Sequence, residues 1–117
     1  MIKHYTLKLI NYSKAYLLVG FLLVSGLSYG ALSGTYTIDK GSAASSTNYQ
    51  SFTSIFGDMY NGTRTDGGTS NGSGVSGPVV INVVSASGPY TEQFTIFQIS
   101  GVSSTNTITL NGNGNAV

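Results

Sequence analysis

The chain has no cysteine and no tryptophan, a single histidine, two prolines and few charged residues. Without cysteine it has no disulfide and no thiol nucleophile. The histidine is His4, close to the N-terminus. A Ser-His-Asp triad or a zinc site of the His/Cys kind is therefore not expected, and we predict no cofactor and no metal ligands.

The first thirty residues have the pattern of a signal peptide. Three lysines precede an apolar run at residues 17–27, and the small residues Ser28 and Gly30 precede Ala31. A basic start, an apolar middle and small residues at the cleavage site are typical of a secretory signal peptide. The run is shorter than the roughly 20 residues of a spanning helix, so a retained anchor is the weaker alternative. We expect a secreted or cell-surface protein that meets the membrane only through this signal peptide.

After residue 30 the charge balance changes sign. Two basic residues remain, Lys40 and Arg64, against four acidic ones, which gives a net charge of −2. No basic patch is left to attract a phosphate backbone. The sequence therefore predicts no nucleic-acid partner.

Residues 31–74 are expected to form a capping unit. Residues 32–39 alternate as a half-buried strand does. Residues 49–60 show the helical period, with a start at Asn48 or a slightly later one at Ser51, a stop at residues 61–62 and a Gly- and Ser-rich connector over 63–77. The apolar face of this helix comprises Tyr49, Phe52, Ile55, Phe56 and Met59, and Tyr60 is also expected to pack in the core.

Residues 75–117 read as short β-branched strands at 79–84, 90–97 and 107–110, each closed by a turn, with a further turn at 111–115. Short, even spacing of this kind is typical of a coiled β-solenoid. Asparagines repeated at the corners of rungs can stack into hydrogen-bonded ladders, but for residues 111–115 a simple turn is the favoured interpretation. Because roughly three coils must stack for stability, we expect 75–117 to be the first, incomplete rungs of a larger mainly β fold.

Three segments carry a resemblance: SGPVVINV at 76–83, GPYTEQFTI at 88–96 and TNTITL at 105–110. Together with the preceding helix, they resemble the N-terminal segment of large secreted surface proteins of Bacteroidetes, which are similar to right-handed parallel β-helices of the pectin-lyase type. The resemblance implies that the helix caps the first rung. The pattern of Gly88, Tyr90 and Glu92 also resembles a structural piece of pectin methylesterases.

No catalytic residue is expected in this chain. Glu92 is the only glutamate, and its carboxylate is expected to point outward or to accept the N–H groups of a turn. Tyr90 is the weak candidate for contact with a sugar, because aromatic faces suit the C–H surface of carbohydrates.

The sequence thus predicts a non-catalytic cap of an exported β-helix protein that acts in adhesion or glycan binding. Its expected partners are the downstream rungs of the same protein and surface glycans. The alternative is the N-terminal part of a polysaccharide lyase or carbohydrate esterase whose catalytic residues lie beyond residue 117.

Overall fold

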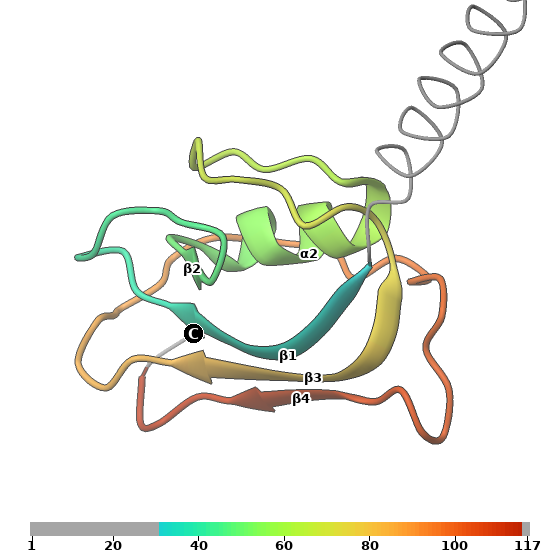
Figure 1. Ribbon diagram of the computed structural model, residues 1–117. Helices are drawn as coiled ribbons and strands as arrows, with labels where there is room; N and C mark the ends of the chain where they lie inside the picture. The colour runs from blue at the N-terminus through green and yellow to red at the C-terminus, as the bar shows by residue number, and fades with distance from the viewer. Residues whose placement is uncertain (1–30, 116–117) are drawn as a thin grey trace, which may run out of the picture.

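The computed structural model describes residues 31–115, and the predicted signal peptide, residues 1–30, lies outside them. The described chain is mainly β, with one four-stranded sheet and one short helix (Figure 1). The elements are β1 (Leu32–Ile38), β2 (Asn48–Tyr49), α2 (Phe52–Asn61), β3 (Val75–Val83) and β4 (Ile108–Asn111). Within residues 31–115 no helix has both the length and the apolar character needed to cross a bilayer.

The sheet is parallel throughout, in the order β2-β1-β3-β4. Strand β1 alternates as predicted, with Tyr36 and Ile38 buried and Thr35 exposed. Strand β3 begins four residues before the predicted start at 79. The pairing of β1 with β3 is irregular between Val75 and Val79, and such a bulge accommodates Pro78, which has no N–H for a regular ladder.

The helix starts later than the first of the two predicted caps. Ser51 is the N-cap, and its side-chain oxygen accepts the N–H of Ser54 at 3.1 Å. Tyr49 therefore belongs to β2 rather than to the helix. The predicted stop is confirmed, since Gly62 ends the helix in the left-handed conformation with φ of 73° and donates its N–H to the carbonyl of Asp58.

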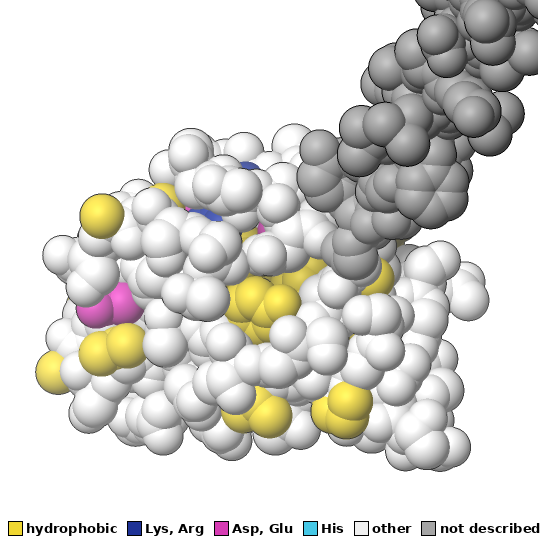
Figure 2. All heavy atoms as spheres, viewed as in Figure 1, with side chains coloured by type: hydrophobic (Ala, Val, Ile, Leu, Met, Phe, Trp, Pro, Cys, Tyr) yellow, Lys and Arg dark blue, Asp and Glu magenta, His cyan; other side chains and the backbone are white. Residues whose placement is uncertain are grey.

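The core lies between one face of the sheet and α2 (Figure 1). The five residues of the predicted helix face are all buried in it. They pack with strand residues in a single cluster formed by Leu32, Tyr36, Ile38, Tyr49, Phe52, Ile55, Phe56, Met59, Val75, Val79, Ile81, Val83, Tyr90 and Ile99. The outer surface carries few charged groups and only scattered apolar areas in the view of Figure 2.

The strand predicted at residues 90–97 is absent, so that prediction is wrong. This segment runs beside α2, where Phe94 stacks on Phe52 and Phe56. A helix uses its backbone groups for its own hydrogen bonds, so it offers no ladder to a neighbouring strand. Side chains therefore hold residues 90–97, despite their β-branched and aromatic composition.

Polar side chains on the outer face of the sheet line up across all four strands. Thr37 is in register with both Asn48 and Asn82, and Asn82 is in register with Asn111. The Thr37 hydroxyl donates to Asn48 Oδ1 at 2.7 Å, and Asn111 Nδ2 donates to Asn82 Oδ1 at 2.8 Å. The prediction of a simple turn at 111–115 is thus corrected at Asn111, which ends β4 and makes a ladder contact.

Gly101 provides a test of how the turn before β4 packs against the start of β3. Its φ is +87°, and a Cβ there would overlap the carbonyl oxygen of Val75. We expect Gly101→Ala to lower the free energy of unfolding by roughly 1–3 kcal/mol, measured by urea denaturation. Gly112→Ala is the matched control, because a Cβ at Gly112 meets nothing within 4 Å. Equal stability of the two variants would contradict this packing.

Candidate functional site

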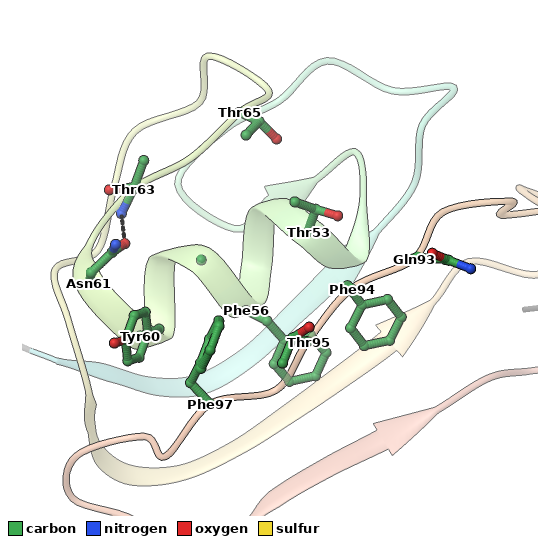
Figure 3. Close-up of a pocket in the computed structure, with 11 residues that line it drawn as sticks. Thr53, Phe56, Tyr60, Asn61, Thr63, Thr65, Gln93, Phe94, Thr95 and Phe97 are labelled. Carbon is green, nitrogen blue, oxygen red and sulfur yellow. Dashed lines mark hydrogen bonds between the residues drawn. The ribbon is translucent and has the colours of Figure 1, made fainter.

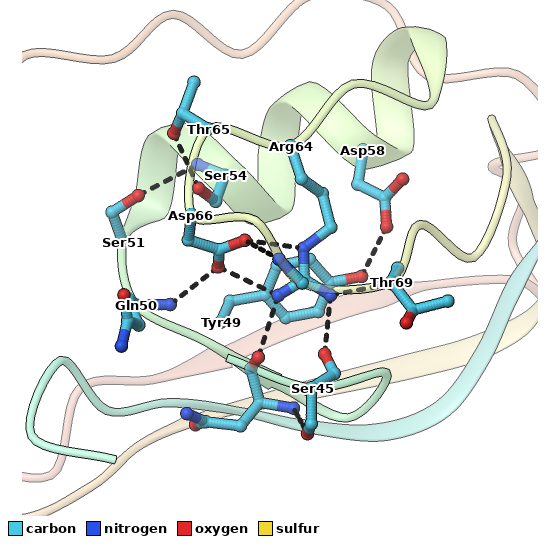
Figure 4. A network of polar contacts seen from close by, with 12 residues as sticks. Ser45, Tyr49, Gln50, Ser51, Ser54, Asp58, Arg64, Thr65, Asp66 and Thr69 are labelled. Atoms are coloured by element: carbon cyan, nitrogen blue, oxygen red, sulfur yellow. Dashed lines mark hydrogen bonds and ion pairs between the residues drawn. The ribbon is translucent and has the colours of Figure 1, made fainter. Parts of the chain in front are cut away.

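A buried guanidinium group joins three segments next to α2. Arg64 lies in the Gly- and Ser-rich connector, and its side chain is 1% exposed. Its Nε and Nη2 form a bidentate ion pair with Asp66 at 2.9 and 2.8 Å (Figure 4). The other N–H groups bind the carbonyls of Ser45, Asn48 and Thr69 at 2.6–2.8 Å. All five donors of the group are therefore used.

The guanidinium also covers an aromatic ring. The Arg64 carbon Cζ lies 3.8 Å from the ring centroid of Tyr49. This cation–π contact places a desolvated charge on a buried ring, where such contacts are strongest. We call Tyr49, Asp58, Arg64, Asp66 and Asn71 the Arg64 network.

Asp58 is the fully buried carboxyl group of this network. It accepts the Tyr49 hydroxyl at 2.6 Å, the Ser70 hydroxyl at 2.5 Å and the Asn71 N–H at 3.0 Å. Asn71 also donates its side-chain amide to the Tyr49 oxygen at 2.9 Å. Since buried polar groups cost free energy unless they are paired, these contacts are what make the burial of Asp58 possible.

Two groups of the network have shifted pKa values. Burial, followed by the hydrogen bond to Asp58, raises the pKa of Tyr49 well above its usual value. Burial alone would raise the pKa of Asp66 as well. The hydrogen bonds from Arg64 and from the N–H groups of Gln50 and Gly68 outweigh it and lower the pKa of Asp66 to about 2. Both residues thus keep a fixed protonation state at neutral pH.

Glu92 binds the N-terminus of α2. Its Oε2 accepts the N–H of Phe52 at 3.2 Å, and its Oε1 accepts the N–H and the hydroxyl of Thr53, each at 2.7 Å. A carboxylate at a helix N-terminus satisfies free N–H groups and complements the helix dipole. The sequence predicts that Glu92 points outward or accepts turn N–H groups; the N–H groups that it accepts belong instead to the first turn of α2.

Tyr90 is 5% exposed, which places it in the core. Its ring meets Phe52 edge-on at 5.4 Å, and Lys40 Nζ lies 5.2 Å from its centroid. The Tyr90 hydroxyl accepts the N–H of Lys40 and contacts the Ser87 hydroxyl and the Ile38 carbonyl. A ring so enclosed offers no face to a sugar, so its position argues against the predicted contact.

A groove of about 350 Å³ runs between α2 and residues 93–97 (Figure 3). Phe56 and Phe94 lie along it, and Tyr60 and Phe97 stack on each other at 4.6 Å near one end. Tyr60 is 48% exposed and Phe97 is 53% exposed. The expectation that Tyr60 packs in the core is therefore wrong. The remaining lining is uncharged and polar: Thr53, Asn61, Thr63, Thr65, Gln93 and Thr95, with Gly57.

Sequence reasoning missed both the Arg64 network and the groove. Arg64 is the only arginine of the chain, and Asp66 follows it in a segment that otherwise lacks charge. That isolated pair was a usable signal for a buried contact. No comparable signal marks Tyr60 and Phe97, because their approach depends on how residues 93–97 lie along α2.

Residues 31–115 contain no group of three His, Cys, Asp or Glu side chains that would hold a metal ion. Comparisons with protein-family models, with curated proteins and with solved structures found no match. The resemblance to surface β-helix proteins therefore stays a prediction.

The Asp66 pKa predicts how stability depends on pH. The folded-state pKa is about 2, against an ordinary value of 3.8. The stabilisation from the ionised group is complete above that ordinary value and is lost as the pH falls toward 2. Urea denaturation between pH 5 and pH 2 should show this loss.

Asp66→Asn should weaken the protein at pH 5 by about 3 kcal/mol, because Arg64 stays buried without its partner, and should flatten this part of the pH dependence. Asp39→Asn, in a carboxylate that binds only its own turn, should leave the loss in place. A wild-type stability that stays constant down to pH 2 would contradict the assignment.

Proposed function

We propose that this chain is the non-catalytic N-terminal cap of a larger exported protein, a right-handed parallel β-helix that acts in adhesion or glycan binding. In this arrangement β1, β3 and β4 are successive rungs of one sheet. Helix α2 and the segment 90–97 are the return paths of the first two coils. The next coil of the same protein then pairs with β4.

The difference between the two edges of the sheet is the observation that carries this proposal. At one edge, β2 pairs with Thr37 and Ile38 of β1, and the Arg64 guanidinium packs over the ring of Tyr49. At the other edge, β4 is the last strand of the order that the described residues form. Leu110 on β4 is 44% exposed although its register partner Ile81 is fully buried. An inward-facing position that is half exposed is what a missing neighbour coil leaves behind.

The distribution of charge supports the same interpretation. Every charged residue after position 30 lies between Asp39 and Glu92, and residues 93–117 carry none. Exposed edge strands are usually protected by charged residues, by proline or by a cover. Strand β4 has no charge and no proline, as expected for a strand that pairs with another rung.

Reading the coding sequence past the codon for Val117 tests the proposal directly. An open frame with further strands similar to residues 79–83 supports the cap. Clustered Asp, Arg or Lys residues on successive rungs would favour the lyase or esterase instead. An immediate stop codon would contradict the proposal.

The unpaired edge of β4, which we call the open edge, also predicts self-association of the chain. Unpaired N–H and C=O groups on β4 should pair with those of a second copy at high concentration, which sedimentation velocity detects. Leu110→Lys adds an inward-facing charge to this edge and should reduce association at least tenfold. Val84→Lys is the matched control, since Val84 is similarly exposed, at 37%, but follows β3. A monomer at every concentration would contradict an open edge.

A further inference from the structure

The open edge explains the exposure of Leu110 but leaves the aromatic pair of Tyr60 and Phe97 unexplained. Tyr60 lies in the last turn of α2, and Phe97 lies on the segment that faces this helix, after Gln93 and Thr95 (Figure 3). The groove between them is bounded on both sides by the chain itself, so a further coil on β4 is not needed to complete it. Two half-exposed rings side by side in a groove are typical of a binding surface.

The absence of charge among the residues that line the groove favours a neutral ligand. None of its lining residues is charged. Each acid that adjoins a lining residue along the chain is engaged elsewhere: Glu92 binds the N-terminus of α2, Asp58 is fully buried in the Arg64 network, and Asp66 pairs with Arg64. Arg64 is paired with Asp66, and Lys40 donates to the Pro89 carbonyl at 2.6 Å. A phosphate, a sulfated glycan or an acidic peptide would therefore find no counter-charge there.

The polar rim favours a sugar over an apolar ligand. The Tyr60 hydroxyl, the Thr63 and Thr95 hydroxyls and the Gln93 amide make no hydrogen bond within residues 31–115, so they are available to a ligand. Hydroxyls and amides both donate and accept hydrogen bonds. Sugar hydroxyls do the same, whereas a proline-rich peptide presents mainly carbonyl acceptors. The aromatic faces suit the C–H surface of a sugar ring.

We infer that the groove between α2 and residues 93–97 binds a neutral saccharide, with Phe97 and Tyr60 packing against the sugar ring and the polar rim binding its hydroxyls. The inference deepens the adhesive or glycan-binding role proposed above and rests on it. It also moves the sugar contact from the buried Tyr90 to two rings that are half exposed.

Isothermal titration calorimetry of the full chain with cellohexaose, xylohexaose and mannohexaose tests this inference. At least one neutral oligosaccharide should bind, with an affinity that changes less than twofold between 50 and 500 mM NaCl, because no ion pair forms. Hexagalacturonate, which is anionic, should not bind. Failure of all three neutral sugars to bind would overturn the inference, as would binding only of hexagalacturonate or of a proline-rich peptide.

Variants locate the contact. Phe97→Ala should weaken binding at least tenfold, and Phe97→Tyr should retain it, because the ring is kept. Val102→Ala is the control, since Val102 is 49% exposed but does not line the groove. Unchanged affinity of Phe97→Ala would place binding elsewhere and overturn the inference. These outcomes are independent of the Leu110→Lys experiment, so the groove and the cap can fail separately.

Discussion

An α-helix satisfies its backbone hydrogen bonds within itself, and this constraint determines how the segments around α2 are held. Nothing can extend a β-ladder from α2, so residues 90–97 lie beside it through side chains alone. Glu92 binds the helix N-terminus, and Phe94 stacks between Phe52 and Phe56. The groove with Tyr60 and Phe97 exists for the same reason, because two segments that share no backbone ladder leave space between them.

The Arg64 network joins segments of this small domain as a disulfide does in many others. It joins the loop before β2, the connector after α2 and the helix itself through Asp58. A single lost partner would leave a buried charge or hydroxyl unpaired, and such groups are costly in a core. A Gly- and Ser-rich connector that looks flexible in the sequence is therefore fixed at Arg64, Asp66 and Asn71. Composition alone does not reveal this, because the acceptors for Arg64 are mostly backbone carbonyls.

The pattern of neighbouring residues was enough to predict β1, the end of α2 and the position of β4. The strands show in alternating or β-branched residues, and the helix end shows in a glycine. The strand predicted at 90–97 failed because strand formation needs a partner that α2 cannot supply. The exposure of two tyrosines differs from what local pattern suggests, for a related reason. Tyr90 follows a turn yet is buried under Lys40 and against Phe52, whereas Tyr60 continues an apolar helical period yet lies half exposed. Burial at such positions is decided by contacts far apart in the sequence.

The column of Thr37, Asn82 and Asn111 runs across the strands toward the free side of β4. Asn111 lies at the end of this column, and its backbone and carboxamide are displayed together on the edge strand. An arriving strand with Asn or Thr at the matching position gains a side-chain bond only when it is in register, and a slip by one residue loses it. The column of Thr37, Asn82 and Asn111 can therefore fix the register of the next strand. At the opposite edge β2 pairs only with Thr37 and Ile38, so in the proposed longer protein further strands would add at β4, in the direction from the N-terminus to the C-terminus.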